Sequence, residues 1–301
     1  MSLFSPGSRR GAQTLERAAV RGRSLWDDAR RRLWRNKAAA TGMAVLALLA
    51  LAAAIGPYLS PYAYDEVRKT DVWMAPLSGG HLLGTDALGR DLLARLLVGL
   101  RVSLAIGLVA TAVSLVIGVT WGATAGFVGG RTDETMMRIV DVLYSLPFIF
   151  FVILLMVTFG SSLVLMFVAI GAVEWLTMSR IVRGQTLALK QKEFVEAARA
   201  AGLTDSGIIR RHIVPNLLGP VVVYVTLTIP AVILAESFLS FLGLGVQPPM
   251  ASLGGLIADG AQQMELAPWL LIFPSAAMIV TLLSFNFIGD GLRDAIDPKD
   301  R

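Results

Sequence analysis

Long apolar stretches separated by short polar or basic segments make up most of this chain. Six stretches have about the length of helix, ~20 residues, that crosses a hydrocarbon core. They cover residues 38–59, 102–127, 139–159, 163–177, 216–236 and 269–288. Pro147 in the third stretch, and Pro220 and Pro230 in the fifth, predict kinks. The pattern predicts an all-α, polytopic membrane protein with about six transmembrane helices.

Basic residues distinguish the two sides of the membrane. The first 37 residues contain ten Lys and Arg against three acids, and the segment that begins near Ser179 is the next densest basic region. Residues 237–292 contain no Lys or Arg, and the Gly- and Pro-rich part over 237–249 is predicted to lie on the outer face or to re-enter the membrane. Because basic loops stay inside, both termini and the segment after Ser179 are predicted to be cytoplasmic.

This topology divides the chain into a tail and a membrane domain. Residues 1–37 are predicted to form a basic cytoplasmic tail, with a short amphipathic helix over 25–34 on the membrane surface. The membrane domain, residues 38–301, is predicted to contain a first span over 38–59, an outer loop over 60–99, a core over 100–292 and a short cytoplasmic tail over 293–301.

Composition and motifs exclude several kinds of chemistry. The chain is 55% hydrophobic and 16% charged, and its net charge of +5 lies beside apolar spans and does not form the basic stripe typical of nucleic-acid binding. The sequence contains no GxxxxGK[ST] loop, no HExxH, no GxSxG and no cysteine. We therefore expect no catalytic residue, no metal site and no cofactor in this chain, and no hydrolysis of ATP by it.

Residues 192–220 form a charged segment inside this apolar protein. Glu193 to Ala201 favour a helix, Gly202 is a suitable left-handed stop, and Thr204 or Asp205 can cap a second helix. The first helix places small alanines beside the carboxylate of Glu196, which predicts a narrow surface that a groove on another protein can accept. An ordinary amphipathic linker is the alternative.

The same segment carries a resemblance to a known family. Glu196-Ala197-Ala198, followed by Gly202 and Pro215, resembles the EAA loop of ATP-binding-cassette (ABC) importer permeases. His212 and Val214 depart from the general pattern, in which Ile and Leu are usual, but the variant RHIVPN is typical of peptide-importing permeases. Similarity to the oligopeptide-permease C subunits runs along nearly the whole chain. The resemblance implies the type I ABC importer permease fold in a bacterial inner membrane.

The resemblance also implies a function and partners. It implies a non-catalytic subunit of an oligopeptide importer, which forms half of the channel together with a homologous second permease. Two ATPase subunits that bind ATP and Mg would dock on the cytoplasmic coupling helix, and an external peptide-binding protein would deliver the peptide. Dipeptides, nickel or another small solute are alternative substrates within the family. The residues implied in ATPase coupling are Glu193, Glu196, Ala197, Ala198, Ala201, Gly202 and Pro215.

Three acids lie in or near the predicted spans. A carboxylate at membrane depth costs ~2.5 to 3.5 kcal/mol and normally faces a cavity or a partner. Asp141 and Glu174 are expected near span ends, where an ion-paired or snorkelling role is favoured. Glu236 is the candidate for the translocation path near an outer gate, where it can meet a peptide's N-terminal amine; a structural role at a helix end is equally open. A proton-coupled transporter that uses Glu174 or Glu236 is the less favoured alternative, because no internal inverted repeat is evident.

Two further patterns have a structural interpretation. Small residues recur on one face of the second span, at Ala110, Ser114, Gly118, Gly122 and Gly126. This ladder predicts close helix packing, either within the subunit or with another permease. The stretch Gly84 to Asp91, GTDALGRD, resembles a signature of peptide and nickel importer permeases, and a capped interfacial turn explains it equally well.

Overall fold

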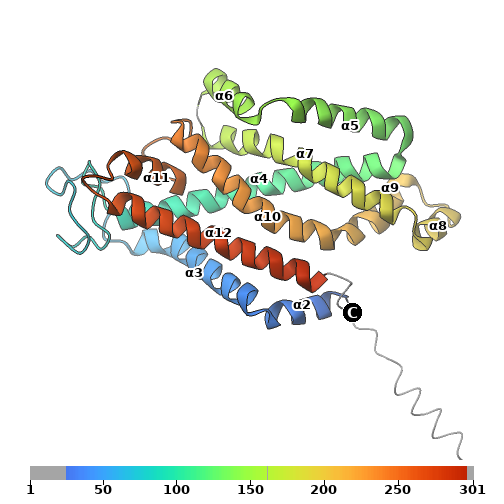
Figure 1. Cartoon of the computed structure of the whole chain (residues 1–301), viewed down its shortest axis with the longest axis horizontal. Helices are drawn as coiled ribbons and strands as arrows, with labels where there is room; N and C mark the ends of the chain where they lie inside the picture. Colours follow the sequence, from blue (N-terminus) through green and yellow to red (C-terminus); the bar gives the residue numbers. More distant parts are fainter. Residues whose placement is uncertain (1–24, 161, 297–301) are drawn as a thin grey trace, which may run out of the picture.

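The computed structural model describes residues 25–160 and 162–296, and this part of the chain is almost entirely helical (Figure 1). No strand longer than an isolated bridge occurs in these residues. The predicted tail residues 1–24 and 297–301 lie outside the described residues. The helices are α2 Leu25–Arg35, α3 Lys37–Leu59, α4 Leu92–Val128, α5 Gly130–Ser145, α6 Phe148–Phe159, α7 Leu163–Leu189, α8 Glu193–Ala200, α9 Asp205–Ile208, η1 Ile209–Ile213, α10 Val214–Phe241, α11 Leu253–Gln262 and α12 Trp269–Ile296.

The helices agree with a membrane protein of about six spans. Five of them, α3, α4, α7, α10 and α12, are long and apolar enough to cross a membrane, and there are six spans if the bent pair of α5 and α6 is counted as one. The predicted all-α fold class is therefore confirmed. α2 covers the range in which the amphipathic helix was predicted, and its position on a membrane surface stays a prediction.

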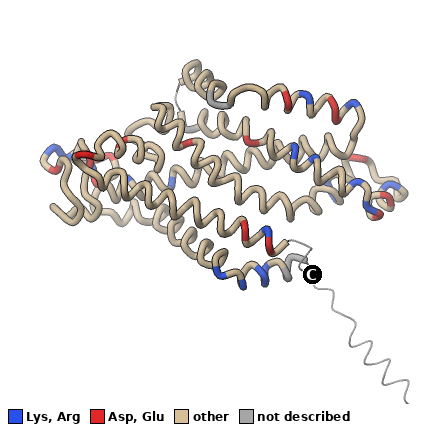
Figure 2. Tube along the Cα trace, viewed as in Figure 1, with Lys and Arg blue, Asp and Glu red and all other residues tan. Residues whose placement is uncertain are grey.

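The charged residues lie mostly at the two ends of the helix bundle and along α5 (Figure 2). One end carries α8 and α9, and the opposite end carries α11 and the long loop between α3 and α4 (Figure 1). The middle of the bundle is dominated by uncharged residues. This distribution is the one expected when the ends face water and the middle faces hydrocarbon.

α4 and α7 make the most extensive helix–helix contact in the structure. The small residues Gly118, Gly122 and Gly126 form this contact, because a Cβ on them would meet Met178, Ser179 or Arg183 of α7. The small-residue ladder therefore serves packing within the subunit. The sequence alone did not distinguish this packing from contact with another permease.

Several element boundaries differ from the sequence prediction. α4 begins at Leu92 and not near residue 102, because Asp91 caps it by accepting a hydrogen bond from the Ala94 N–H at 2.8 Å. The segment between the second and third predicted stretches is helical from Gly130, as part of α5. α10 continues to Phe241, five residues beyond the predicted end at Glu236.

The third predicted span is broken and not merely kinked. α5 ends at Ser145, Leu146 and Pro147 have extended backbone, and α6 begins at Phe148. The two helices differ in direction by 80°. Because Pro147 cannot donate a backbone hydrogen bond and restricts the residue before it, the helix stops here.

Candidate coupling surface and membrane-embedded acids

The charged segment forms two short helices joined by the turn that the sequence predicts. α8 ends in a Schellman motif: Gly202, at φ 80°, donates its N–H to the Arg199 carbonyl at 2.9 Å, and Leu203 donates to the Ala198 carbonyl at 3.2 Å. The Thr204 hydroxyl accepts a hydrogen bond from the Gly207 N–H and caps α9. Capping thus fixes the direction in which α8 leaves the bundle.

One face of α8 is anchored in the protein core. Val195 and Ala198 are buried, with exposed fractions of 0% and 6%, in a cluster that also contains Phe127 of α4 and Leu217 of α10. The Arg199 guanidinium lies 5.5 Å from the centre of the Phe127 ring. α8 is therefore attached to two of the membrane helices through close packing.

The structure separates the predicted coupling residues into two groups. Ala198 faces the core, so it cannot contact a partner directly. The exposed members of the set are Glu193, Glu196, Ala197, Ala201, Gly202 and Pro215. The exposed group forms a small-residue surface with two carboxylates, and ATPase contact by this surface stays a prediction.

His212 has a structural environment. It lies in η1, where its carbonyl accepts a hydrogen bond from the Asn216 amide at 2.6 Å and its ring lies 6.4 Å from the Phe194 ring. No group of three or more potential metal ligands occurs among residues 25–160 and 162–296. These contacts give His212 a structural place in the coupling segment.

Glu236 lies in a closed polar network near the end of the bundle opposite α8. Its side chain is fully buried and accepts hydrogen bonds from Ser240 and Ser252 at 2.7 Å each and from Ser103 at 3.5 Å. The Ser103 hydroxyl accepts a further bond from the Leu253 N–H at 3.0 Å. The carboxylate thereby links α10, α11 and α4, so contact with a peptide would require this network to open.

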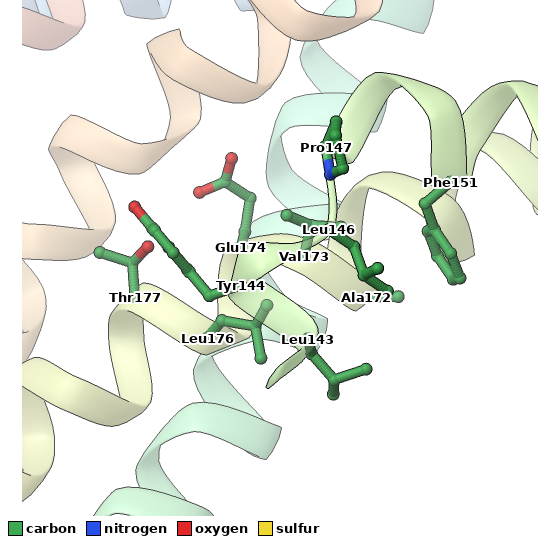
Figure 3. A pocket seen from close by; sticks show the side chains of 10 residues that line it. All are labelled: Leu143, Tyr144, Leu146, Pro147, Phe151, Ala172, Val173, Glu174, Leu176 and Thr177. Atoms are coloured by element: carbon green, nitrogen blue, oxygen red, sulfur yellow. The ribbon is translucent and has the colours of Figure 1, made fainter. Parts of the chain in front are cut away.

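The other two acids have different surroundings. Asp141 pairs with Arg180 of α7 at 2.7 Å, which is an ion-paired role of the kind that the sequence favoured. Glu174 is not near a span end, because it is the twelfth of the 27 residues of α7. It lines a cavity of about 410 Å³ between α5, α6 and α7, together with Tyr144 and Thr177 (Figure 3).

The loop before α4 contains a buried polar group that sequence reasoning missed. His81, with an exposed fraction of 1%, lies 2.9 Å from Asp91 through Nδ1, and its ring stacks on Tyr62 at 4.3 Å between centroids. Asp86 accepts hydrogen bonds from the backbone and side chain of Arg90 at 3.0 and 2.7 Å. The GTDALGRD stretch therefore forms a capped turn, and an Asp directly before a helix was the available signal.

Known protein families match both parts of the chain. Residues 118–301 match the family described as the binding-protein-dependent transport system inner membrane component. Residues 24–76 match the N-terminal transmembrane domain of oligopeptide transport permease C. The two matches together leave only residues 77–117 and the first 23 residues uncovered.

Individual relatives are similar over nearly the full length. The oligopeptide transport system permease protein OppC of Escherichia coli (strain K12) is 54% identical over 299 residues, which cover 98% of this chain and 99% of the relative. The protein of the same name from Haemophilus influenzae is 53% identical over 291 residues, with 96% and 94% covered.

A solved structure has the same fold. The inward-facing MetNI methionine ABC transporter contains a chain that superposes with a TM-score of 0.54 at 21% identity. The match covers 67% of this chain and 96% of the other. At this identity the likeness concerns the fold alone, and it supports the ABC importer permease architecture that the helices indicate.

Proposed function

Because the chain belongs to the family of binding-protein-dependent transport system inner membrane components, and within it to the oligopeptide permease C proteins, we propose that it is one transmembrane subunit of an ATP-driven oligopeptide importer. The observation that carries the substrate class is the identity above 50% with oligopeptide permeases over nearly the whole length. The chain is a multi-pass membrane subunit and not an enzyme, so ATP is handled by partner subunits.

The proposed assembly has three kinds of protein partner. A homologous second permease completes the channel, two ATPase subunits bind ATP and Mg²⁺ on the cytoplasmic side, and an external protein delivers the peptide. α5 and α6 expose large apolar side chains, among them Phe150 and Val157 at 70% and 72%, which are available to membrane lipid and to the second permease. In this arrangement both termini are cytoplasmic.

The proposed coupling follows from the two faces of α8. The exposed side chains of Glu193, Glu196 and Ala197 contact an ATPase subunit, and the buried Val195 and Ala198 transmit its displacement to α4 and α10. Because the packed core resists compression, a movement of α8 shifts the ends of these membrane helices. The channel then switches between inward- and outward-facing states.

Copurification from the native membrane tests this function. The tagged chain is purified in mild detergent, the bound proteins are identified, and ATPase activity is measured with the external binding protein loaded with oligopeptide, dipeptide or nickel. We expect a second permease and ATPase subunits, with the strongest stimulation by oligopeptide. A dipeptide or nickel preference would reassign the substrate within the family.

A lone chain that transports solute by itself would contradict the proposed function. That result would favour the proton-coupled alternative, with Glu174 and Glu236 as its titrating groups. A variant with Glu196→Ala provides the internal control, because it should insert normally while the recovery of ATPase subunits falls.

A further inference from the structure

The break between α5 and α6 creates a cavity at the level of the middle of α7. Apolar side chains form most of its wall (Figure 3). They include Leu143 of α5, Phe151 of α6, and Ala172 and Val173 of α7. Its volume of about 410 Å³ lies within the ~300 to 1,000 Å³ of ordinary small-molecule sites. It opens to the outside of the chain, since Tyr144 at its rim is 52% exposed.

Glu174 supplies the one carboxylate among the residues that line this cavity. With the ~1.5 Å rise of an α-helix, it lies about 17 Å from one end of α7 and about 22 Å from the other. A carboxylate at that depth requires a cation or a wet cavity. In the described part of the chain Glu174 makes no ion pair and no hydrogen bond.

The next two cations along α7 do not pair with Glu174. Arg180, six residues later on α7, pairs with Asp141 at 2.7 Å and lies over the Tyr144 ring, 4.3 Å from its centre. Arg183, a turn further, pairs with Asp133 at 2.5 Å. Both arginines are therefore engaged by α5, and the charge of Glu174 is left for a group that enters the cavity.

We propose that Glu174, with the hydroxyls of Tyr144 and Thr177, binds an ammonium group of the transported solute in the cavity at the α5–α6 break. An ammonium group donates three hydrogen bonds. The carboxylate and the two hydroxyl oxygens supply three acceptors, and Figure 3 shows them on the same side of the cavity. The apolar wall opposite accommodates the side chain that follows the ammonium group.

This inference rests on the proposed function, in which the solute is a peptide, and a peptide offers an ammonium group in two places. One is the N-terminal amine and the other is the side chain of lysine. Both have the same charge and donors, so the cavity chemistry alone accepts either one. The test therefore uses peptides that carry one of the two groups or neither.

The test measures transport by the complete reconstituted complex with its external binding protein. Wild type and the Glu174→Gln variant are compared on a peptide with a free amine and neutral side chains, an N-acetylated peptide with one lysine, and an N-acetylated neutral peptide. Because both complexes use the same binding protein, its own selectivity cancels in the ratio of variant to wild type. Glu134→Gln, an exposed acid of α5 outside the cavity, is the matched control.

We expect Glu174→Gln to raise the KM for at least one ammonium-bearing peptide about tenfold, the loss expected for a hydrogen bond to a charged group. Transport of the neutral peptide should change less than twofold, and Glu134→Gln should match wild type throughout. The peptide whose KM rises shows whether the cavity binds the N-terminal amine or the lysine side chain.

Two results would overturn the inference while leaving the proposed function intact. One is that, for each of the three peptides, Glu174→Gln transports it as well as wild type does. The other is a uniform loss for all three peptides with reduced recovery of the second permease, which would make Glu174 an intersubunit ion-pair residue. A wild-type complex that transports none of the peptides would instead refute peptide import itself.

Discussion

Gly202 and Gly184 show how one residue defines the coupling helix. Both have open space where a Cβ would stand, so steric crowding distinguishes neither of them. Gly202, however, has φ 80° in the Schellman turn, whereas Gly184 lies within the helix α7. A side chain at Gly202 would therefore cause backbone strain but no steric clash. A substitution there tests the turn conformation without changing the packing.

We predict that Gly202→Ala weakens the coupling segment by about 1 to 2 kcal/mol, the cost of a left-handed conformation for an L-residue. Gly184→Ala should be neutral or stabilising by up to ~1 kcal/mol, because Ala favours the helix. Limited proteolysis at the α8–α9 turn measures the difference. Equal protection in both variants would show that the positive φ at Gly202 is not important.

Glu236 allows a second comparison at the scale of the residue. We predict that Glu236→Ala lowers the stability of the folded chain by about 1 to 3 kcal/mol, because the buried hydroxyls of Ser103, Ser240 and Ser252 lose their shared acceptor. Glu236→Gln keeps an acceptor oxygen and should lower the stability less than Glu236→Ala does. Thermal unfolding in detergent provides the measurement, and two unchanged variants would rule out a structural network.

Sequence patterns located some residues of the site and misplaced others. Gly202 was predictable because a left-handed helix stop has a local signature. The burial of Ala198 was not, since it depends on Phe127 and Leu217 from distant parts of the chain. Glu174 was misplaced because the apolar run ends near Thr177, whereas α7 continues to Leu189 with its arginines paired to Asp133 and Asp141.

At the scale of the elements, the contact between α4 and α7 depends on the absence of side chains. Gly118, Gly122 and Gly126 let the backbone of α4 approach residues 178–183 of α7. The four-residue spacing predicted this face correctly, because a helix repeats every 3.6 residues. It could not identify the partner helix, since periodicity describes a surface and not what covers it.

We predict that Gly122→Val destabilises the chain by about 1 to 3 kcal/mol, because its side chain would collide with the Ser179 carbonyl and with Val182. Thr120→Val is the control on an exposed face of the same helix and should change stability by less than ~0.5 kcal/mol. Thermal unfolding of the two variants compares them. Equal unfolding temperatures would contradict the packing role of the ladder.

At the scale of the whole molecule, the two ends of the bundle present different polar environments. The end that carries α8 exposes charged residues beside small ones, and the opposite end holds Glu236 and the His81–Asp91 pair in closed networks. The charge pattern predicted the polar ends and the apolar middle of the bundle, because the hydrocarbon core dictates where polar residues can lie. It did not predict the buried His81–Asp91 pair. The break at Pro147 was predicted only as a kink, since its extent depends on how α5 and α6 pack on α7.

Site-directed photo-crosslinking from α8 within the assembled transporter tests whether α8 contacts an ATPase subunit. The chain contains no cysteine, so Ala197→Cys and Ala198→Cys each introduce a single thiol that can carry a photoreactive group. We predict that the probe at the exposed position 197 crosslinks to an ATPase subunit, and that the thiol at the buried position 198 labels and crosslinks poorly. Crosslinking to the ATPase from neither position, or equally from both, would contradict the assignment of α8 as the coupling helix.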